Sequence, residues 1–236
     1  MQNNISVTKN NVSFLVEDSK ELHQDVGYNF WLERYSSWEP GTFKVFDSYL
    51  SKDKDYLDIG AWVGPTAIYG SFLSRSVIAV EPDPVAFKIL EKNISLNSIE
   101  NIQTLNKAAS KLEQVFLEPT KFFGDSMTRV SENSLGSNAV GGIALDVLIS
   151  MGDFSLIKID IEGYEFSLVR EYVNVLNRSK IPLLLSVHGP FFSNGDTLMK
   201  DLLHDLREVK SILSENGEEI DRETIVNSFG SYLFIW

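Results

Sequence analysis

From about residue 55 onward, short apolar runs alternate with longer segments in which apolar residues recur at helical spacing. The runs DYLDIG, SVIAVE, NIQTLNKAA, SLIKIDI and IPLLLSVH predict successive strands. The segments between them predict crossover helices, and in one of these Asp83 is the expected N-cap and Pro84 the first helical residue. Strands joined in this way lie parallel in one sheet with helices on both faces.

The last part of the chain predicts a different edge for this sheet. VKSILSENGEEI and GSYLFIW can pair as antiparallel strands. We therefore expect an α/β fold with a mostly parallel seven-stranded sheet, an antiparallel C-terminal edge and a domain over residues 51–236. Residues 1–50 form an N-terminal extension that can close over a ligand as a lid or pack against the core. Aromatic residues crowd part of it, among them Tyr28, Phe30, Trp31, Tyr35 and Trp38.

Composition and charge narrow the function. The chain has 236 residues and no cysteine, which excludes thiolate metal sites and cysteine nucleophiles and fits a reducing compartment. Its net charge is −12 and its basic residues are scattered, so nucleic acid is not an expected partner. No apolar run reaches the roughly 18 residues that a membrane span needs, and the first thirty residues lack the pattern of a signal peptide. We expect a cytoplasmic protein.

The strand ends are where a ligand is expected, because open α/β sheets bind ligands beyond the carboxyl ends of their strands. YLDIGAWVG runs from the first of these strands into a turn with Gly60 and Gly64, where backbone can approach a ligand closely. The G-x-G-x-x-G fingerprint and the P-loop are both absent, which argues against pyrophosphate. Glu81 ends the second strand, at the position where a carboxylate accepts hydrogen bonds from ribose hydroxyls.

Four segments then give a more specific indication. YLDIGAWVG, VIAVEPDPVAFKILEKNISLN, NKAAS and LIKIDIEGYEFSLV resemble, in this order, the motifs of the FkbM family of S-adenosylmethionine-dependent methyltransferases, and WEPGTFKVF is similar to the segment upstream of them. The resemblance covers roughly residues 38–188. It implies a Rossmann-like class I methyltransferase fold, S-adenosylmethionine as cofactor, and O-methylation of a hydroxyl on a sugar or other small-molecule natural product.

The resemblance also implies roles for individual residues. Cofactor contacts are expected from Asp58, Gly60, Ala61, Trp62, Gly64, Glu81, Pro82, Asn106, Ala108 and Asp160. Substrate contacts are also expected from Glu39 and from Glu162 and Glu165, which match the family's second signature. Independently of the resemblance, the long irregular segment between the third and fourth strands suggests substrate contacts from Asp125, Ser126 and Thr128, although a solvated hairpin tip explains these three equally well. Trp62 departs from the Asn or His common in the family, and its indole either narrows the methionine end of the pocket or points away.

Methyl transfer to an alcohol needs a base that accepts the hydroxyl proton. His188, at the end of the fifth strand, is the first catalytic candidate because the unperturbed pKa of histidine lies near neutrality. Asp160 is the second. Asp160, Glu162 or Glu165 with His188 could suit magnesium or manganese, but their spacing is not tight, and no metal site is predicted. Lys158 lies in an apolar strand and needs a partner, for which Asp146 is expected.

Two other functions stay open from the sequence. A non-catalytic cofactor-binding or scaffold protein on the same fold would result if Trp62 blocked the methionine end. An NAD(P)-dependent reductase is disfavoured by the missing fingerprint. The acceptor molecule and the oligomeric state are left open.

Overall fold

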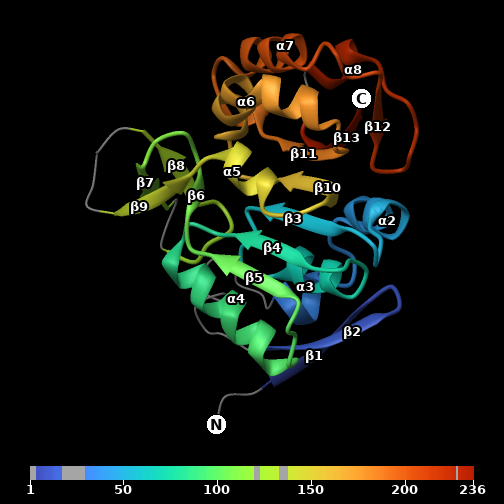
Figure 1. Cartoon of the computed structure of the whole chain (residues 1–236), viewed down its shortest axis with the longest axis vertical. Helices are drawn as coiled ribbons and strands as arrows, with labels where there is room; N and C mark the ends of the chain where they lie inside the picture. Colours follow the sequence, from blue (N-terminus) through green and yellow to red (C-terminus); the bar gives the residue numbers. More distant parts are fainter. Residues whose placement is uncertain (1–3, 18–29, 120–122, 133–137, 227) are drawn as a thin grey trace.

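A mostly parallel sheet of seven strands runs through the molecule (Figure 1). The computed structural model describes residues 4–17, 30–119, 123–132, 138–226 and 228–236. The strand order is β12-β13-β11-β10-β3-β4-β5. The parallel strands are β3 (Asp55–Ile59), β4 (Val77–Val80), β5 (Ile102–Leu105), β10 (Phe154–Ile159) and β11 (Leu183–Val187). β12 (Ser211–Ser214) and β13 (Gly230–Ile235) form the antiparallel edge. The expected sheet is confirmed.

Helices cover both faces of this sheet. The helices are α2 (Pro40–Tyr49), α3 (Pro65–Ser71), α4 (Pro84–Leu96), α5 (Leu145–Ser150), α6 (Glu165–Ser179), α7 (Gly195–Asp205) and α8 (Arg222–Val226). Successive residues of a strand point to opposite faces, and in β3 Leu57 packs with α5, α6 and α7 whereas Tyr56 packs with α2, α3 and α4. The core therefore consists of two apolar layers, one on each side of the sheet.

The start of α4 follows the sequence prediction closely. The Asp83 carboxylate accepts the backbone N–H groups of Val85 and Ala86, and Pro84 opens the helix. α3 ends at Ser71, and Phe72, which follows it, is 41% exposed.

Two smaller sheets flank the main one. β6 (Ala108–Ala109), β9 (Ala139–Ile143), β7 (Gln114–Glu118) and β8 (Arg129–Ser131) form a four-stranded sheet. β1 (Asn4–Lys9) and β2 (Val12–Glu17) form a hairpin beside α4, where the backbone N–H groups of β2 donate to the side-chain oxygens of Asn93 and Asn97. Figure 1 shows these sheets at two separate edges of the molecule.

The described part of the N-terminal fifty residues packs against the rest of the chain. A short π-helix (Phe30–Arg34) brings Phe30, Trp31 and Tyr35 into edge-to-face contact with one another. Phe30 also meets Trp62, with ring centroids 4.9 Å apart. Tyr28 lies outside the described residues. No helix in the described ranges is both long and apolar enough to cross a membrane.

Candidate active site at the strand ends

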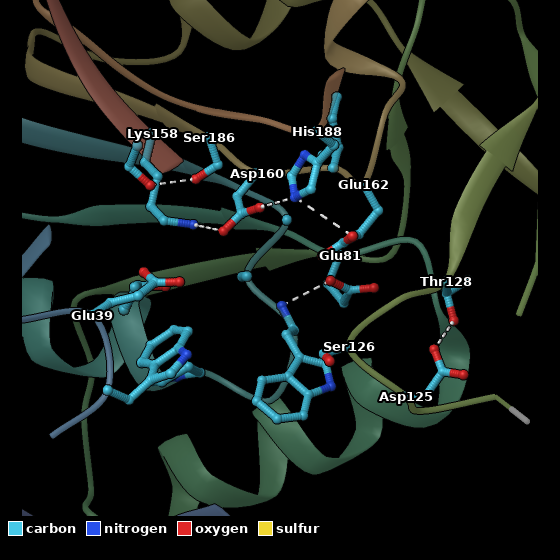
Figure 2. A pocket seen from close by; sticks show the side chains of 18 of the residues that line it. Glu39, Glu81, Asp125, Ser126, Thr128, Lys158, Asp160, Glu162, Ser186 and His188 are labelled. Atoms are coloured by element: carbon cyan, nitrogen blue, oxygen red, sulfur yellow. Dashed lines mark hydrogen bonds and ion pairs between the residues drawn. The ribbon is translucent and has the colours of Figure 1, made fainter. Parts of the chain in front are cut away.

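A cavity of about 590 Å³ opens at the carboxyl ends of the parallel strands. Its volume lies within the range of about 300–1,000 Å³ typical of small-molecule sites. Side chains and backbone from β3, β4, β10 and β11 meet there with the segments around Trp38 and Asp125. Figure 2 shows that the labelled polar side chains point into this space from several sides.

Glu81, directly after β4, lies in the wall of the cavity. Its Oε2 accepts the backbone N–H of Trp62 and its Oε1 accepts the backbone N–H of Asp83, both at 2.8 Å. Burial raises the pKa of Glu81 to about 8. Each carboxylate oxygen keeps a lone pair after these bonds, so Glu81 can accept further hydrogen bonds from ligand hydroxyls.

The indole of Trp62 forms part of the same wall. Trp62 has a left-handed backbone (φ 48°), which turns the chain between β3 and α3. Its Nε1–H donates to the carbonyl oxygen of Gly124 at 3.0 Å, and the backbone N–H of Gly124 donates to Asp83. These bonds hold the indole toward the segment that contacts Asp83, on the same side of the cavity as Glu81.

Three ionisable side chains meet at the ends of β10 and β11. The Nε2 atom of His188 lies 3.6 Å from Oδ1 of Asp160 and 3.5 Å from Oε2 of Glu162. The Nδ1 atom of His188 hydrogen-bonds to Oε1 of Glu165 at 2.9 Å, and Glu165 is completely buried. Lys158 donates to Oδ2 of Asp160 at 3.0 Å. Figure 2 shows His188 between Asp160 and Glu162, with Lys158 beyond Asp160.

Burial and close charges shift the pKa values of this group. Burial alone would lower the pKa of His188, but its hydrogen bond to Glu165 and the surrounding carboxylates raise it to about 9. Burial raises the pKa of Glu162 to about 7. Burial also opposes ionisation of Asp160, yet the charge of Lys158 brings the pKa of Asp160 below its ordinary value. A pKa of about 9 keeps His188 charged at neutral pH, which disfavours it as a base.

The structure brings most of the predicted site residues to one cavity. The predicted residues that line it are Glu39, Gly60, Ala61, Trp62, Glu81, Pro82, Asp125, Ser126, Thr128, Asp160, Glu162 and His188. The predicted residues that do not line it are Asp58, Gly64, Asn106, Ala108 and Glu165.

Three of these five residues contact residues that line the cavity. Asp58 is fully buried and accepts a hydrogen bond from the hydroxyl of Thr66. Asn106 donates through its side-chain amide to the carbonyl oxygens of Glu81 and Pro82. Glu165 supports His188 from behind. Their cofactor and substrate roles remain predictions, and their positions outside the cavity lining do not support direct contact with a ligand.

Sequence reasoning missed Lys158 as a cavity residue and assigned it the wrong partner. Its side chain lines the cavity and pairs with Asp160, not with Asp146. The charges of Asp160, Asp58 and Glu39 outweigh burial and raise the pKa of Lys158. The Lys-x-Asp spacing contained the signal, because residues two apart in a strand point to the same face.

Comparisons with known proteins agree with this arrangement. The sequence pattern of the methyltransferase FkbM domain matches residues 58–220. A ribosomal protein L11 methyltransferase of Alkaliphilus oremlandii is 27% identical over 175 residues, which make up 74% of this chain and 40% of that protein. The same enzyme of Clostridium perfringens is 36% identical over 63 residues, or 26% of this chain and 20% of that protein. This chain thus spans well under half the length of these two relatives.

Two solved structures have similar folds. The 16S rRNA N2 G1207 methyltransferase of T. thermophilus, in complex with AdoMet and guanosine, superposes with a TM-score of 0.54 at 13% identity and covers 99% of this chain and 50% of that one. A methyltransferase FkbM of Methylobacillus flagellatus superposes with a TM-score of 0.48 at 18% identity, and the match covers 79% of this chain and 44% of that one. The first likeness confirms the class I methyltransferase fold. With the domain match over most of its length, the chain belongs to the FkbM family of S-adenosylmethionine-dependent methyltransferases.

Proposed function

We propose that this protein O-methylates a hydroxyl of a small molecule, such as a sugar or another natural product. The observation that carries the proposal is the cavity itself, which has Glu81 on one side and Asp160, Glu162 and His188 on another. The net charge of −12 supports a small acceptor over a nucleic acid, because phosphate backbones require basic surfaces.

The residues present fit the cofactor. S-adenosylmethionine carries ribose hydroxyls, an ammonium, a carboxylate and a sulfonium whose methyl group is the electrophile. Glu81 would hold the ribose hydroxyls, since both its oxygens are already oriented by backbone N–H groups. The carboxylates of Glu39 and Asp160 suit the positive groups, and Lys158 suits the carboxylate.

Asp125, Ser126 and Thr128 line the cavity near Trp62 and offer polar side chains for acceptor binding. Glu39, whose pKa burial raises to about 7, lines the same cavity. Positioning the hydroxyl oxygen beside the methyl group supplies most of the rate, because a fixed near-attack geometry removes an entropic cost. Asp160 is the group that can receive the hydroxyl proton directly, whereas His188, with a pKa raised to about 9, would first have to give up its own proton.

A non-catalytic scaffold would require Trp62 to block the site. The hydrogen bond from its indole to Gly124 instead leaves a cavity of about 590 Å³ beside the ring, which supports a ligand-binding role. We further propose that residues 1–50 act as an extension of the 51–236 domain that closes one side of this cavity. Phe30 and Trp38 line it.

Calorimetry with S-adenosylhomocysteine tests the cofactor assignment. Wild type should bind it, and Glu81→Ala should bind about tenfold more weakly or worse, since it removes charge-assisted hydrogen bonds. Glu91→Ala, an exposed glutamate on α4, should bind like wild type. Absence of binding by wild type would overturn the proposal, and equal binding by Glu81→Ala would remove the ribose role.

Transfer of a labelled methyl group tests the acceptor class. The label is offered with sugars, with polyhydroxylated natural products, with ribosomal RNA and with ribosomal protein L11. We expect product only with the small hydroxyl compounds. Label in RNA or in L11 alone would replace the small-molecule acceptor by a macromolecular one.

A further inference from the structure

We propose that Asp160, Glu162 and His188 form a binding site for a divalent cation such as Mg²⁺ or Mn²⁺. One potential ligand atom from each residue lies within 4.8 Å of the other two. Bonds from such cations to oxygen or nitrogen are about 2.0–2.3 Å long. A cation placed among the three atoms can therefore reach all of them after shifts of a few tenths of an ångström.

Strand ends and a tight turn position the three ligands. Asp160 follows the last residue of β10, and His188 follows the last residue of β11, which pairs with β10. Glu162 has a left-handed backbone (φ 55°) and precedes Gly163, also at positive φ (110°). This turn brings the Glu162 side chain back toward the strand ends, where Figure 2 shows it facing His188.

His188 is oriented as a metal ligand would be. Its side chain is 3% exposed, and its Nδ1 atom is held by Glu165 at 2.9 Å. Glu165 also accepts the backbone N–H groups of His188 and Gly163. With its proton on Nδ1, the imidazole presents the lone pair of Nε2 to Asp160 and Glu162. A carboxylate behind the histidine is the usual support of a metal-binding imidazole.

One acidic atom of the cluster lacks a hydrogen-bond partner among the described residues. Oε2 of Glu162 is buried and, within the described residues, accepts no hydrogen bond. Its contact with Nε2 of His188, at 3.5 Å, exceeds the usual N–H···O range of about 2.7–3.2 Å. A buried carboxylate oxygen without a partner is costly. A bound cation would satisfy it.

The charge balance also favours a cation. Asp160, Glu162 and Glu165 surround one imidazole, and Lys158 donates to Oδ2 of Asp160 while Oδ1 faces Nε2 of His188. Two carboxylates and one imidazole suit Mg²⁺ or Mn²⁺ better than they suit zinc in a structural site, where thiolates and imidazoles dominate.

Manganese binding tests this site without measuring activity. Protein dialysed against a chelator is titrated with Mn²⁺, and free Mn²⁺ is followed by electron paramagnetic resonance. We expect one Mn²⁺ per chain, binding at least tenfold weaker in Glu162→Gln and in His188→Gln, and about 10–100-fold weaker in Glu165→Gln through loss of orientation. Glu215→Gln removes another cavity carboxylate outside the cluster and should bind like wild type.

Two results would overturn the site. Either wild type binds no stoichiometric Mn²⁺, in which case a proton on His188 balances the carboxylates, or Glu162→Gln and His188→Gln bind Mn²⁺ as wild type does. Because His188 is buried, each variant is first checked by circular dichroism, and the partly exposed Glu162 keeps the test decisive if His188→Gln unfolds. S-adenosylhomocysteine binding is measured on the same chelated samples, so loss of cofactor binding and loss of cation binding are separate outcomes.

Discussion

The ionisation of Glu81 should control how cofactor binding depends on pH. Only the ionised carboxylate accepts hydrogen bonds through both oxygens, and burial raises the pKa of Glu81 to about 8. Bound cofactor favours the ionised form, so affinity for S-adenosylhomocysteine should increase as pH rises toward that value and level off above it. Below it, affinity should fall by up to about tenfold per pH unit.

Calorimetry from about pH 6.5 to pH 9.5 checks this dependence, and buffers with different ionisation enthalpies count the proton released. Glu81→Gln keeps the shape of the side chain but cannot ionise, so its affinity should be lower and nearly constant over the same range. A Gln variant with the pH profile of wild type would assign the dependence to another group.

At this scale the sequence predicts which residues gather but not what each contacts. The ends of parallel strands share one edge of the sheet, which is why Glu81, Asp160 and His188 could be predicted together. The partner of the Trp62 indole could not be predicted, because Gly124 lies in a loop with no periodic pattern. The hydrogen bond between His188 and Glu165 could not be predicted either, because it depends on how α6, which begins at Glu165, is oriented relative to β11.

At the level of elements, Gly60 sets how closely β3 and β10 approach beyond their last residues. Gly60 has a φ of +86°, and a Cβ atom at this position would lie 1.8 Å from the carbonyl oxygen of Asp160. Gly217 has nearly the same φ (+83°) but has nothing within 4 Å of such an atom. A side chain at either glycine would thus strain the backbone to the same degree, but only a side chain at Gly60 would also clash with a neighbouring atom.

Gly217→Ala should lower the free energy of unfolding by about 1 kcal/mol, the cost of the left-handed backbone alone. Gly60→Ala should lower it by about 3 kcal/mol or more, because the two strand ends must also move apart. Urea unfolding followed by circular dichroism measures both. Equal losses of unfolding free energy in the two variants would mean that the ends of β3 and β10 separate at no cost and that Gly60 does not hold them together beside the cavity.

The sequence predicts the elements of the main sheet because their patterns are strong. Apolar runs and helical spacing distinguish β3, β4, β10 and β11 from the helices between them. The small sheet gives no comparable signal. Its strand β9 contains Gly141 and Gly142, and a Cβ atom at Gly142 would lie 1.9 Å from the carbonyl oxygen of Leu112. The position of β9 therefore depends on close approach of two backbone segments and not on an apolar face that the sequence would reveal.

At the level of the whole molecule, Lys9 connects the N-terminal hairpin to the wall of the cavity. Its ammonium donates to the carbonyl oxygens of Tyr35, Ser36 and Trp38, at 3.2, 3.2 and 2.5 Å, and lies 4.5 Å from the centre of the Phe43 ring. Burial lowers the pKa of Lys9, while the charge of Glu39 opposes that shift. Trp38 and Glu39 both line the cavity.

Lys9→Met should therefore loosen residues 35–39 and weaken cofactor binding without a change inside the cavity. Three carbonyl groups lose a charged donor, so the free energy of unfolding should fall by about 1–3 kcal/mol, and amide hydrogen exchange over residues 35–39 should accelerate. Affinity for S-adenosylhomocysteine should fall several-fold. Lys88→Met, an exposed lysine on α4, should change none of these quantities. If exchange over residues 35–39 is unaltered in Lys9→Met, the hairpin does not hold this wall, and the lid role of the extension must rest on the aromatic contacts of Phe30, Tyr35 and Trp38.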